Sequence, residues 1–178
     1  MPLTVRPATP AELPAAGAAV RAAYEADGIG DPDGSYLVVV ADAAARADDA
    51  LVLVAVSGDD VLGSVTYARH GSPWAEVCAA GEAEFRMLGV LPAGRGRGVG
   101  AALVAACADR ARAEGARRLA LSADARSAAA HRLYERAGFE RRVDLDWSPV
   151  PGVQLVGYCL DLSGPGRLNP PGSPAEPR

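Results

Sequence analysis

Cysteine and histidine are scarce in this 178-residue chain, and each scarcity excludes a class of protein. Cys78, Cys107 and Cys159 are odd in number, far apart and without the close spacing of metal ligands. We therefore expect reduced thiols and not a disulfide framework. With only His70 and His131, a histidine-rich metal site is not expected. Aromatic residues make up only 5% of the chain. The sequence predicts no metal.

The net charge of −4 argues against general binding of nucleic acid, which requires a basic surface, although a local basic pocket is still compatible with it. No apolar run reaches the roughly 18 residues that indicate a membrane span. The first ten residues, MPLTVRPATP, contain no apolar segment behind a basic stretch, so we expect no signal peptide and a cytoplasmic protein. The abundance of alanine, arginine and glycine is typical of a bacterial genome with high GC content.

Hydrophobic residues make up 49% of the chain, which is enough for a folded core. The length is that of one domain, and we assign residues 1–163 to it. The remaining segment, 164–178, is rich in proline, glycine and serine, and we expect a disordered tail.

Hydrophobic periodicity and turn residues predict the order β-α-α-β-β-β-α-β-α-β-β. The expected strands are 3–8, two strands flanking a turn at 57–60, and 82–91, 117–123, 140–147 and 153–162. The expected helices run from a cap at Thr9 to Gly28, over 37–50, from Val99 to about Glu114, and from Ser127 to Gly138. Hairpins in the middle and alternating strands and helices later predict an α/β (mixed α+β) fold with a mixed sheet covered by helices.

The segment GRGRGVGAAL, Gly94 to Leu103, combines a glycine-rich turn with the start of a helix, which is how backbone N–H groups are exposed to a phosphate. A triphosphate P-loop requires a lysine that is missing near this turn. Gly96 to Ala101 fits the dinucleotide fingerprint, and Asp124 follows the next strand, but LPAGR intervenes after Val90 and too few βα units follow. A flexible glycine turn without function is the remaining alternative.

Two linked motifs resemble the GNAT acetyltransferase superfamily. The family pattern R/Q-x-x-G-x-G/A is matched by Arg95, Gly98 and Gly100. The pattern N-x-x-A-x-x-x-Y-x-x-x-G-F follows as SAAAHRLYERAGF, residues 127–139, with Ser127 in place of the usual asparagine. The resemblance is sharp from Glu84 to Phe139 and covers 3–162 in the order of elements. It implies the GNAT fold, in which a mostly antiparallel mixed sheet has a splayed central strand.

The resemblance also implies acetyl-CoA as the co-substrate. Its pyrophosphate is expected on the backbone of residues 97–101, where the positive end of the helix favours anions and glycines let the backbone approach closely. Its pantetheine arm is expected on the edge of the strand at 88–90. The expected cofactor-binding residues are Leu88, Gly89, Val90, Arg95, Gly96, Arg97, Gly98, Val99, Gly100, Ala101, Ser127 and Tyr134. The substitution of Ser127 removes one hydrogen-bonding group, and simple capping of the helix is its alternative role.

Acetyl transfer to an amine requires a neutral nucleophile, a polarised thioester and a proton donor for the leaving thiolate. Tyr134 matches the family tyrosine near the sulfur of CoA, so we assign it as the general acid. Glu84 matches the general base of the histone-modifying branch, with Glu82 as the second candidate and a water as a possible relay. His131 is expected on the helix surface. The cysteines give no reason for an acyl-cysteine intermediate, so we expect direct transfer in a ternary complex.

The acceptor is expected between residues 24–36 and 70–82, which contain acidic and aromatic side chains suited to a cationic amine. They are Asp27, Asp31, Asp33, Glu76, Glu82, Trp74, Tyr24 and Tyr36. The leading hypothesis is an N-acetyltransferase acting on a primary amine of a small molecule or peptide. A non-catalytic acyl-CoA-binding or regulatory module is the alternative. Because dimers are frequent in such families, a homodimer is a further hypothesis.

Overall fold

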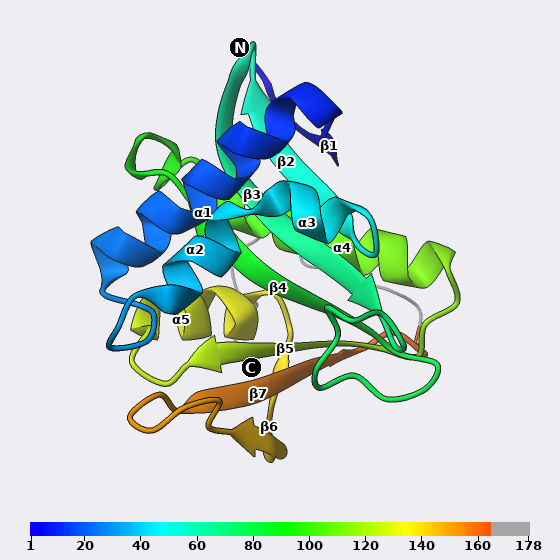
Figure 1. Ribbon diagram of the computed structural model, residues 1–178. Coiled ribbons are helices and arrows are strands. Elements are labelled where there is room, and N and C mark those ends of the chain that lie inside the picture. Colours follow the sequence, from blue (N-terminus) through cyan, green and yellow to red (C-terminus); the bar gives the residue numbers. More distant parts are fainter. Residues whose placement is uncertain (165–178) are drawn as a thin grey trace, which may run out of the picture.

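The computed structural model describes residues 1–164, which form one seven-stranded sheet with helices on both faces (Figure 1). The strands lie in the order β1-β2-β3-β4-β5-β7-β6, and every neighbouring pair is antiparallel except β4 and β5. Their bounds are β1 Leu3–Pro7, β2 Leu51–Ser57, β3 Asp60–Arg69, β4 Ala83–Val90, β5 Arg118–Asp124, β6 Glu140–Trp147 and β7 Leu155–Asp161. The predicted mixed, mostly antiparallel sheet is confirmed.

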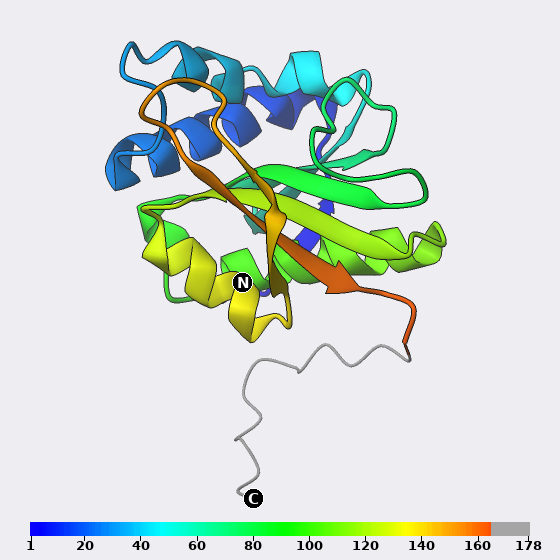
Figure 2. The ribbon, with the colours of Figure 1, turned by 90° about the horizontal axis from the view of Figure 1, so that it is seen from below.

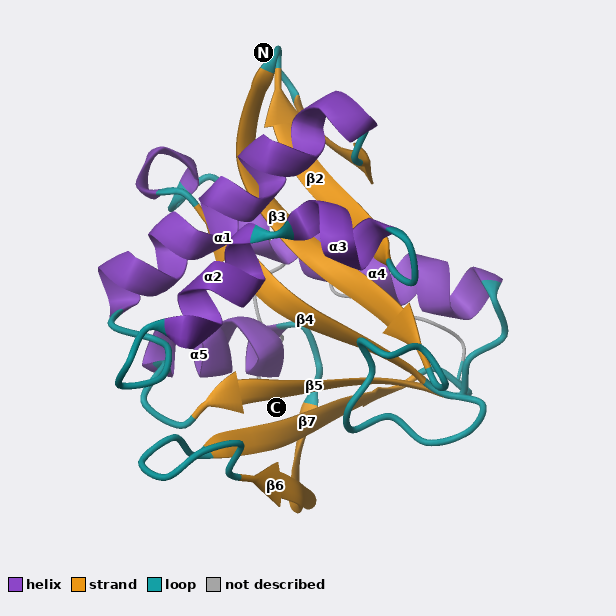
Figure 3. Ribbon diagram, viewed as in Figure 1, coloured by secondary structure: helices purple, strands orange, loops and turns teal. Residues whose placement is uncertain are grey.

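The helices form two layers. Helices α1 (Leu13–Asp27), α2 (Ser35–Ala41) and α3 (Ala43–Ala47) cover one face, and α4 (Val99–Ala113) and α5 (Ala128–Arg136) lie on the other (Figure 2). Figure 3 shows the same arrangement by type of element. Most of the core lies between the sheet and α4, where Leu103, Val104 and Cys107 are buried.

The start of α1 follows the predicted capping pattern. The short 3₁₀ turn Pro10–Glu12 precedes it, and the Glu12 carboxylate accepts hydrogen bonds from the Thr9 backbone N–H (2.8 Å) and from Arg6 (2.7 and 2.8 Å). Gly28 ends the helix in the left-handed conformation, with φ of 64°, which glycine adopts without a steric cost.

The prediction of one helix over 37–50 is wrong. The chain forms α2 and α3 instead, because Asp42 interrupts the helix and its carboxylate caps α3 by accepting the N–H of Ala45 at 2.9 Å. The first of the two helices also begins earlier than expected, at Ser35. Asp31 stabilises this start by accepting the backbone N–H of Tyr36 at 2.9 Å.

Helix α1 lies very close to α2. A Cβ atom at Gly17 would lie 1.8 Å from the carbonyl oxygen of Ala41, so no side chain fits there at the present helix spacing. Gly89 on β4 likewise leaves no room for a side chain, because a Cβ there would lie 2.6 Å from the Cα of Val20 on α1. These two glycines set the distances of α1 from α2 and from the sheet.

Strands β4 and β5 are paired only at one end. Their parallel register covers Ala83 with Leu119 and Glu84 with Ala120, and beyond these pairs the strands diverge (Figure 3). A bulge lies in the diverging part of β4. Arg86 and Gly89 are three residues apart on β4, but the residues that pair with them on β3 are only two residues apart. The divergence leaves a wedge in the middle of the sheet, which is the splay expected of the central strand.

Within the bulge, Met87 has a φ of 52°, the one positive φ of a non-glycine residue in the described part of the chain. The bulge turns Arg86 and Met87 toward the face covered by α1 and α2, while Phe85 and Leu88 pack on the other side.

None of the helices in residues 1–164 has the length and apolarity needed to cross a bilayer. The expected tail lies outside the described residues, apart from Gly164.

Candidate active site

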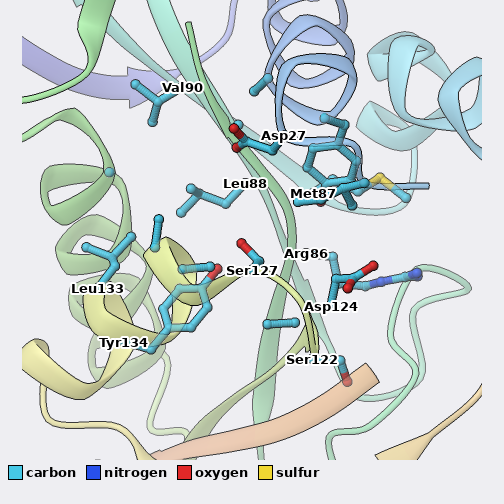
Figure 4. A pocket seen from close by; sticks show the side chains of 18 of the residues that line it. Asp27, Arg86, Met87, Leu88, Val90, Ser122, Asp124, Ser127, Leu133 and Tyr134 are labelled. Carbon is cyan, nitrogen blue, oxygen red and sulfur yellow. The ribbon is translucent and has the colours of Figure 1, made fainter. Parts of the chain in front are cut away.

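A cavity of about 780 Å³ opens in the wedge between β4 and β5 (Figure 4). Its walls come from segments far apart in the sequence: the end of α1 with the loop that follows, β4, the glycine-rich turn before α4, the end of β5 with α5, and the loop between β6 and β7. Of the expected cofactor-binding residues, all line it except Arg97: Leu88, Gly89, Val90, Arg95, Gly96, Gly98, Val99, Gly100, Ala101, Ser127 and Tyr134.

The glycine-rich turn presents the first turn of α4 to the cavity. Gly96 and Gly98 have φ values of 72° and 77°, and a Cβ at either position would meet nothing within 4 Å. Glycine is therefore favoured at both positions by the backbone conformation and not by a lack of space. The N–H groups of Val99, Gly100 and Ala101 precede the first hydrogen bond of the helix, which Ala102 donates to Gly98 at 2.9 Å. These groups and the positive end of the helix face the cavity and are suited to hold an anion.

Arg95 lines this end of the cavity and is paired there with Asp27 at the end of α1, 3.0 Å between Nη2 and Oδ1. Arg97 is exposed and directed elsewhere. A further basic residue, Arg136 on α5, lines the cavity and was not singled out from the sequence.

The edge of β4 at Leu88, Gly89 and Val90 faces the wedge. Gly89 and Val90 are paired with β3 on one side, and no register with β5 extends to them on the other. A strand edge with unpaired backbone groups can accept an amide-bearing ligand in extended conformation.

Tyr134 lies in α5 with its ring packed against Phe85, Phe139 and Tyr158, at centroid distances of 5.7, 6.0 and 6.1 Å. Its hydroxyl points into the cavity between Leu88 and Ser127 (Figure 4) and has no hydrogen-bond partner among the described residues. Only 5% of the residue is exposed, and burial raises the pKa of the phenol well above its usual value. Tyr134 thus holds a protonated hydroxyl at the centre of the cavity.

Ser127 occupies the N-cap position of α5, but its hydroxyl makes no capping bond and points into the cavity (Figure 4). It is therefore available to a ligand. His131, one turn later, is hydrogen-bonded through Nε2 to the carbonyl of Asp124 at 3.0 Å and packs against Tyr158. It is outside the set of cavity-lining residues.

The structure places Glu84 and Glu82 away from the cavity wall. Glu84 is 1% exposed, and its Oε2 accepts the backbone N–H groups of Glu76, Val77 and Cys78 at 2.9, 2.8 and 3.1 Å. It therefore anchors the loop before β4. Glu82 accepts the N–H of Ala79 at 3.0 Å and faces two arginines.

Glu76 belongs to the loop that Glu84 anchors, and it does line the cavity. Its Oε1 is 3.0 Å from Nη2 of Arg86, which also lines the cavity. Burial raises the pKa of Glu76, and the negative charge of Glu84 adds to this, while Arg86 opposes it. Glu76 was expected near the acceptor, whereas Arg86 has no signal in a sequence motif. The loop that carries Glu76 is held by the anchor at Glu84, which the sequence did not show.

Cys78, Cys107 and Cys159 are buried and free, and none lines the cavity. Burial raises the pKa of the Cys78 thiol to about 12, so it stays protonated. Within residues 1–164 there is no group of three or more histidine, cysteine, aspartate or glutamate side chains that could hold a metal ion.

The acetyltransferase (GNAT) family model matches residues 18–139, and the chain belongs to this family. The match includes the glycine-rich turn and Tyr134. In a comparison with curated proteins, no sequence matches this chain.

Solved structures share the fold. A putative acetyltransferase of the GNAT family from Desulfovibrio desulfuricans is 23% identical, with a TM-score of 0.66 over 90% of this chain and 99% of that one. A putative acetyltransferase from Salmonella typhimurium, solved with its cofactor acetyl-CoA, is 21% identical, with a TM-score of 0.64 over 94% and 98%. The ribosomal-protein-alanine N-acetyltransferase from Brucella melitensis is 24% identical, with a TM-score of 0.64 over 89% and 99%. The mixed α/β architecture is that of these GNAT structures.

Proposed function

We propose that this GNAT acetyltransferase transfers the acetyl group of acetyl-CoA to a primary amine by direct transfer in a ternary complex. The observation that carries the proposal is the wedge between β4 and β5, with the Tyr134 hydroxyl inside it and the first turn of α4 at its mouth. One cavity thus combines a strand edge, an anion site and a proton donor.

The donor half of the cavity fits the chemical parts of acetyl-CoA. The pyrophosphate would accept hydrogen bonds from the N–H groups of Val99, Gly100 and Ala101, with Arg95 beside it. The pantetheine amides would pair with the open edge of β4. Ser127 lies along the same path. Arg136, which has no carboxylate partner among the ion pairs of residues 1–164, supplies a further positive charge for the nucleotide part of the cofactor.

The reaction requires few groups. The neutral amine attacks the carbonyl carbon of the thioester, a C–N bond forms, and the C–S bond breaks. Tyr134 donates its proton to the departing thiolate, and the proton lost from the nitrogen restores the balance through solvent. The raised pKa of Tyr134 keeps the phenol protonated near neutral pH, so its proton is present when negative charge develops on the leaving sulfur.

Two features support direct transfer over an acyl-enzyme. No cysteine in the described part of the chain lines the cavity, and the burial of Cys107 raises the pKa of its thiol, which disfavours the thiolate. A covalent intermediate would require a nucleophile beside the thioester.

The alternative function, a non-catalytic acyl-CoA-binding module, shares the donor site and differs only in turnover. Calorimetry with acetyl-CoA, CoA and NAD⁺ tests the donor site, and we expect binding of the first two only. Release of CoA thiol over a panel of amines then separates enzyme from binding module. Acetyl-CoA binding without turnover of any amine would support the module.

Tyr134→Phe tests the acid. We expect turnover to fall by about 10²-fold with acetyl-CoA affinity retained, the lower end of the usual effect of a general acid. Tyr67→Phe is a matched control, because Tyr67 is also a buried tyrosine but donates to Glu114 at 2.9 Å outside the cavity. If Tyr134→Phe and the control turn over equally fast, the assignment is wrong.

A further inference from the structure

The half of the cavity opposite the glycine-rich turn has a largely apolar wall. The β6–β7 loop and the loop after α1 both contribute to it. The lining side chains that make this wall are Tyr24, Ile29, Trp147, Val150, Val153 and Leu155. Tyr24 and Tyr36 pack together there with ring centroids 6.3 Å apart. The expected Trp74 packs against the small cluster that includes Met87, and neither Trp74 nor Asp33 is among the residues that line the cavity.

Four carboxylates line the cavity, and Asp27 among them is paired through Oδ1 with Arg95. Asp31 and Asp124 are occupied by the protein itself. Asp31 accepts the N–H of Tyr36 with both oxygens and the hydroxyl of Ser35 with Oδ2. Asp124 accepts the backbone N–H and the Nε of Arg126 at Oδ1 and its Nη2 at Oδ2, all at 2.8 to 2.9 Å. Hydrogen bonding lowers the pKa of both carboxyls, which stay ionised but saturated. Neither offers a free oxygen to a ligand.

Glu76 is different. Its Oε1 pairs with Arg86 at 3.0 Å, while Oε2 has no hydrogen-bond partner among the described residues. The side chain is 34% exposed toward the cavity, and the loop that carries it is held by Glu84. It therefore presents one carboxylate oxygen at a fixed place beside the apolar wall.

No positive group in this half is available to a ligand. Arg86 donates to the carbonyl of Trp74 at 3.1 Å, pairs with Glu76 and lies 3.9 Å from Glu84. All of its nitrogens thus face groups of the protein.

Arg46 is the other guanidinium nearby, and it is fully buried. It donates to Thr66, Val39 and Asp42, and its remaining nitrogen, Nη2, is closed off from solvent and outside the cavity lining. A ligand carboxylate at the apolar wall would therefore be desolvated without a cation to pair with it.

We propose that the acceptor is a primary amine whose apolar body carries no carboxylate, and that its ammonium binds Oε2 of Glu76 and gives it the proton. The inference rests on the proposed function. A carboxylate on the body would lack a cation to pair with it, so amino acids are excluded at this wall.

The proton balance is simple. Glu76 takes one proton from the ammonium and releases it to solvent, and the neutral amine then attacks the thioester as described above. The groups that face Glu76 are Arg86 and Glu84 on β4 and Tyr36 on α2. Burial raises the pKa of the Glu76 carboxyl, which makes it a better proton acceptor than an exposed glutamate.

Two amines with the same six-carbon chain test the acceptor class: hexylamine and 6-aminohexanoate. Thiol release is measured for each at saturating acetyl-CoA, and hexylamine is also titrated into the CoA-saturated protein by calorimetry. We expect kcat/KM for hexylamine to exceed that for 6-aminohexanoate by about tenfold or more, because the amino acid carries an unpaired negative charge to the wall. Preferential turnover of the amino acid overturns this inference and leaves the acetyltransferase function intact.

Glu76→Gln tests the proton acceptor, with Glu140→Gln on exposed β6 as the matched control. For the intact enzyme, kcat/KM for hexylamine should be independent of pH near neutrality, because Glu76 deprotonates the bound ammonium. The variant should depend on free amine, so its kcat/KM should rise tenfold per pH unit up to the pKa of the amine. Parallel profiles for the variant and the intact enzyme overturn the role of Glu76. Absence of turnover with all amines would overturn the proposed function itself.

Discussion

Asp27 at the end of α1 holds Arg95 of the glycine-rich turn across the mouth of the cavity, with 3.0 Å between Oδ1 and Nη2. Both side chains line the cavity, and both are more than one-third exposed. The Asp27 carboxylate therefore lies beside the site proposed for the pyrophosphate. It also binds Arg95, the arginine proposed to contact the pyrophosphate.

Asp27→Asn should therefore strengthen the binding of acetyl-CoA. The change releases Arg95 and removes a negative charge near the phosphates, and an exposed pair of this kind corresponds to about a two- to fivefold change in Kd. Calorimetry at low salt measures it, and added salt should reduce the difference. Glu25→Gln, which breaks the exposed pair of Glu25 with Arg21, is the control. Weaker binding by Asp27→Asn would show that Asp27 itself contacts the cofactor.

Gly98→Ala should weaken acetyl-CoA binding. An alanine at φ of 77° costs about 1–2 kcal/mol, and relief of this strain would turn the N–H groups of the first turn of α4 away from the cavity. Gly71→Ala is matched, because Gly71 has φ of 94°, open space around its Cβ position and no contact with the cavity. Both variants should lose similar thermal stability, and only Gly98→Ala should lose affinity. Equal affinity of the two would contradict the anion site.

Glu84→Gln distinguishes an anchor from a base. Three backbone N–H groups lose a charged acceptor, and hydrogen bonds to charged groups contribute about 1.5–3 kcal/mol, so the midpoint of thermal unfolding should fall clearly. Acetyl-CoA affinity should be kept, since Glu84 is not part of the cavity wall. A variant with unchanged unfolding and a loss of turnover would instead support the original prediction that Glu84 is the base.

The Glu12 carboxyl should contribute to acid unfolding. Hydrogen bonds from Arg6, and then from Thr9, lower its pKa from 4.5 to about 2. Because the folded form binds this proton less readily than the unfolded form, the stabilisation is present above pH 4.5 and is lost as pH falls toward 2. Thermal unfolding of Glu12→Gln should accordingly depend less on pH across that range than unfolding of the unchanged protein. An identical pH dependence would mean that the Arg6 pair contributes nothing in solution.

The donor half of the site was predictable from sequence because its requirements are local. Glycines at 96, 98 and 100 before a helix predict an anion site, and Tyr134 follows in a spaced motif. All four positions line the cavity, and their roles toward a cofactor stay predictions. Strand β6 was predicted with its observed bounds, since its pattern and flanking turns are local as well.

The segments expected at the acceptor do reach the cavity, because Tyr24, Asp27, Asp31, Tyr36 and Glu76 line it. Their arrangement depends on contacts between distant residues, which the sequence pattern did not show. The break between α2 and α3 follows from the side-chain cap at Asp42 within an otherwise continuous helical pattern. The place of Glu76 depends on three hydrogen bonds to Glu84, which no spacing rule contains. The bulge at Met87 lacks the glycine that usually marks a positive φ.

Gly17 is not among the residues that line the cavity, yet it fixes how closely α2, which carries part of the cavity wall, approaches α1. Any side chain there would push α2 away from α1, and α2 carries Tyr36 and is capped by Asp31, both of which line the cavity. One added methyl group at this helix crossing should therefore move α2, change the shape of the cavity and change which of the proposed amine acceptors fit. Position 17 is a natural starting point for altering acceptor preference without altering a single residue that meets the ligand.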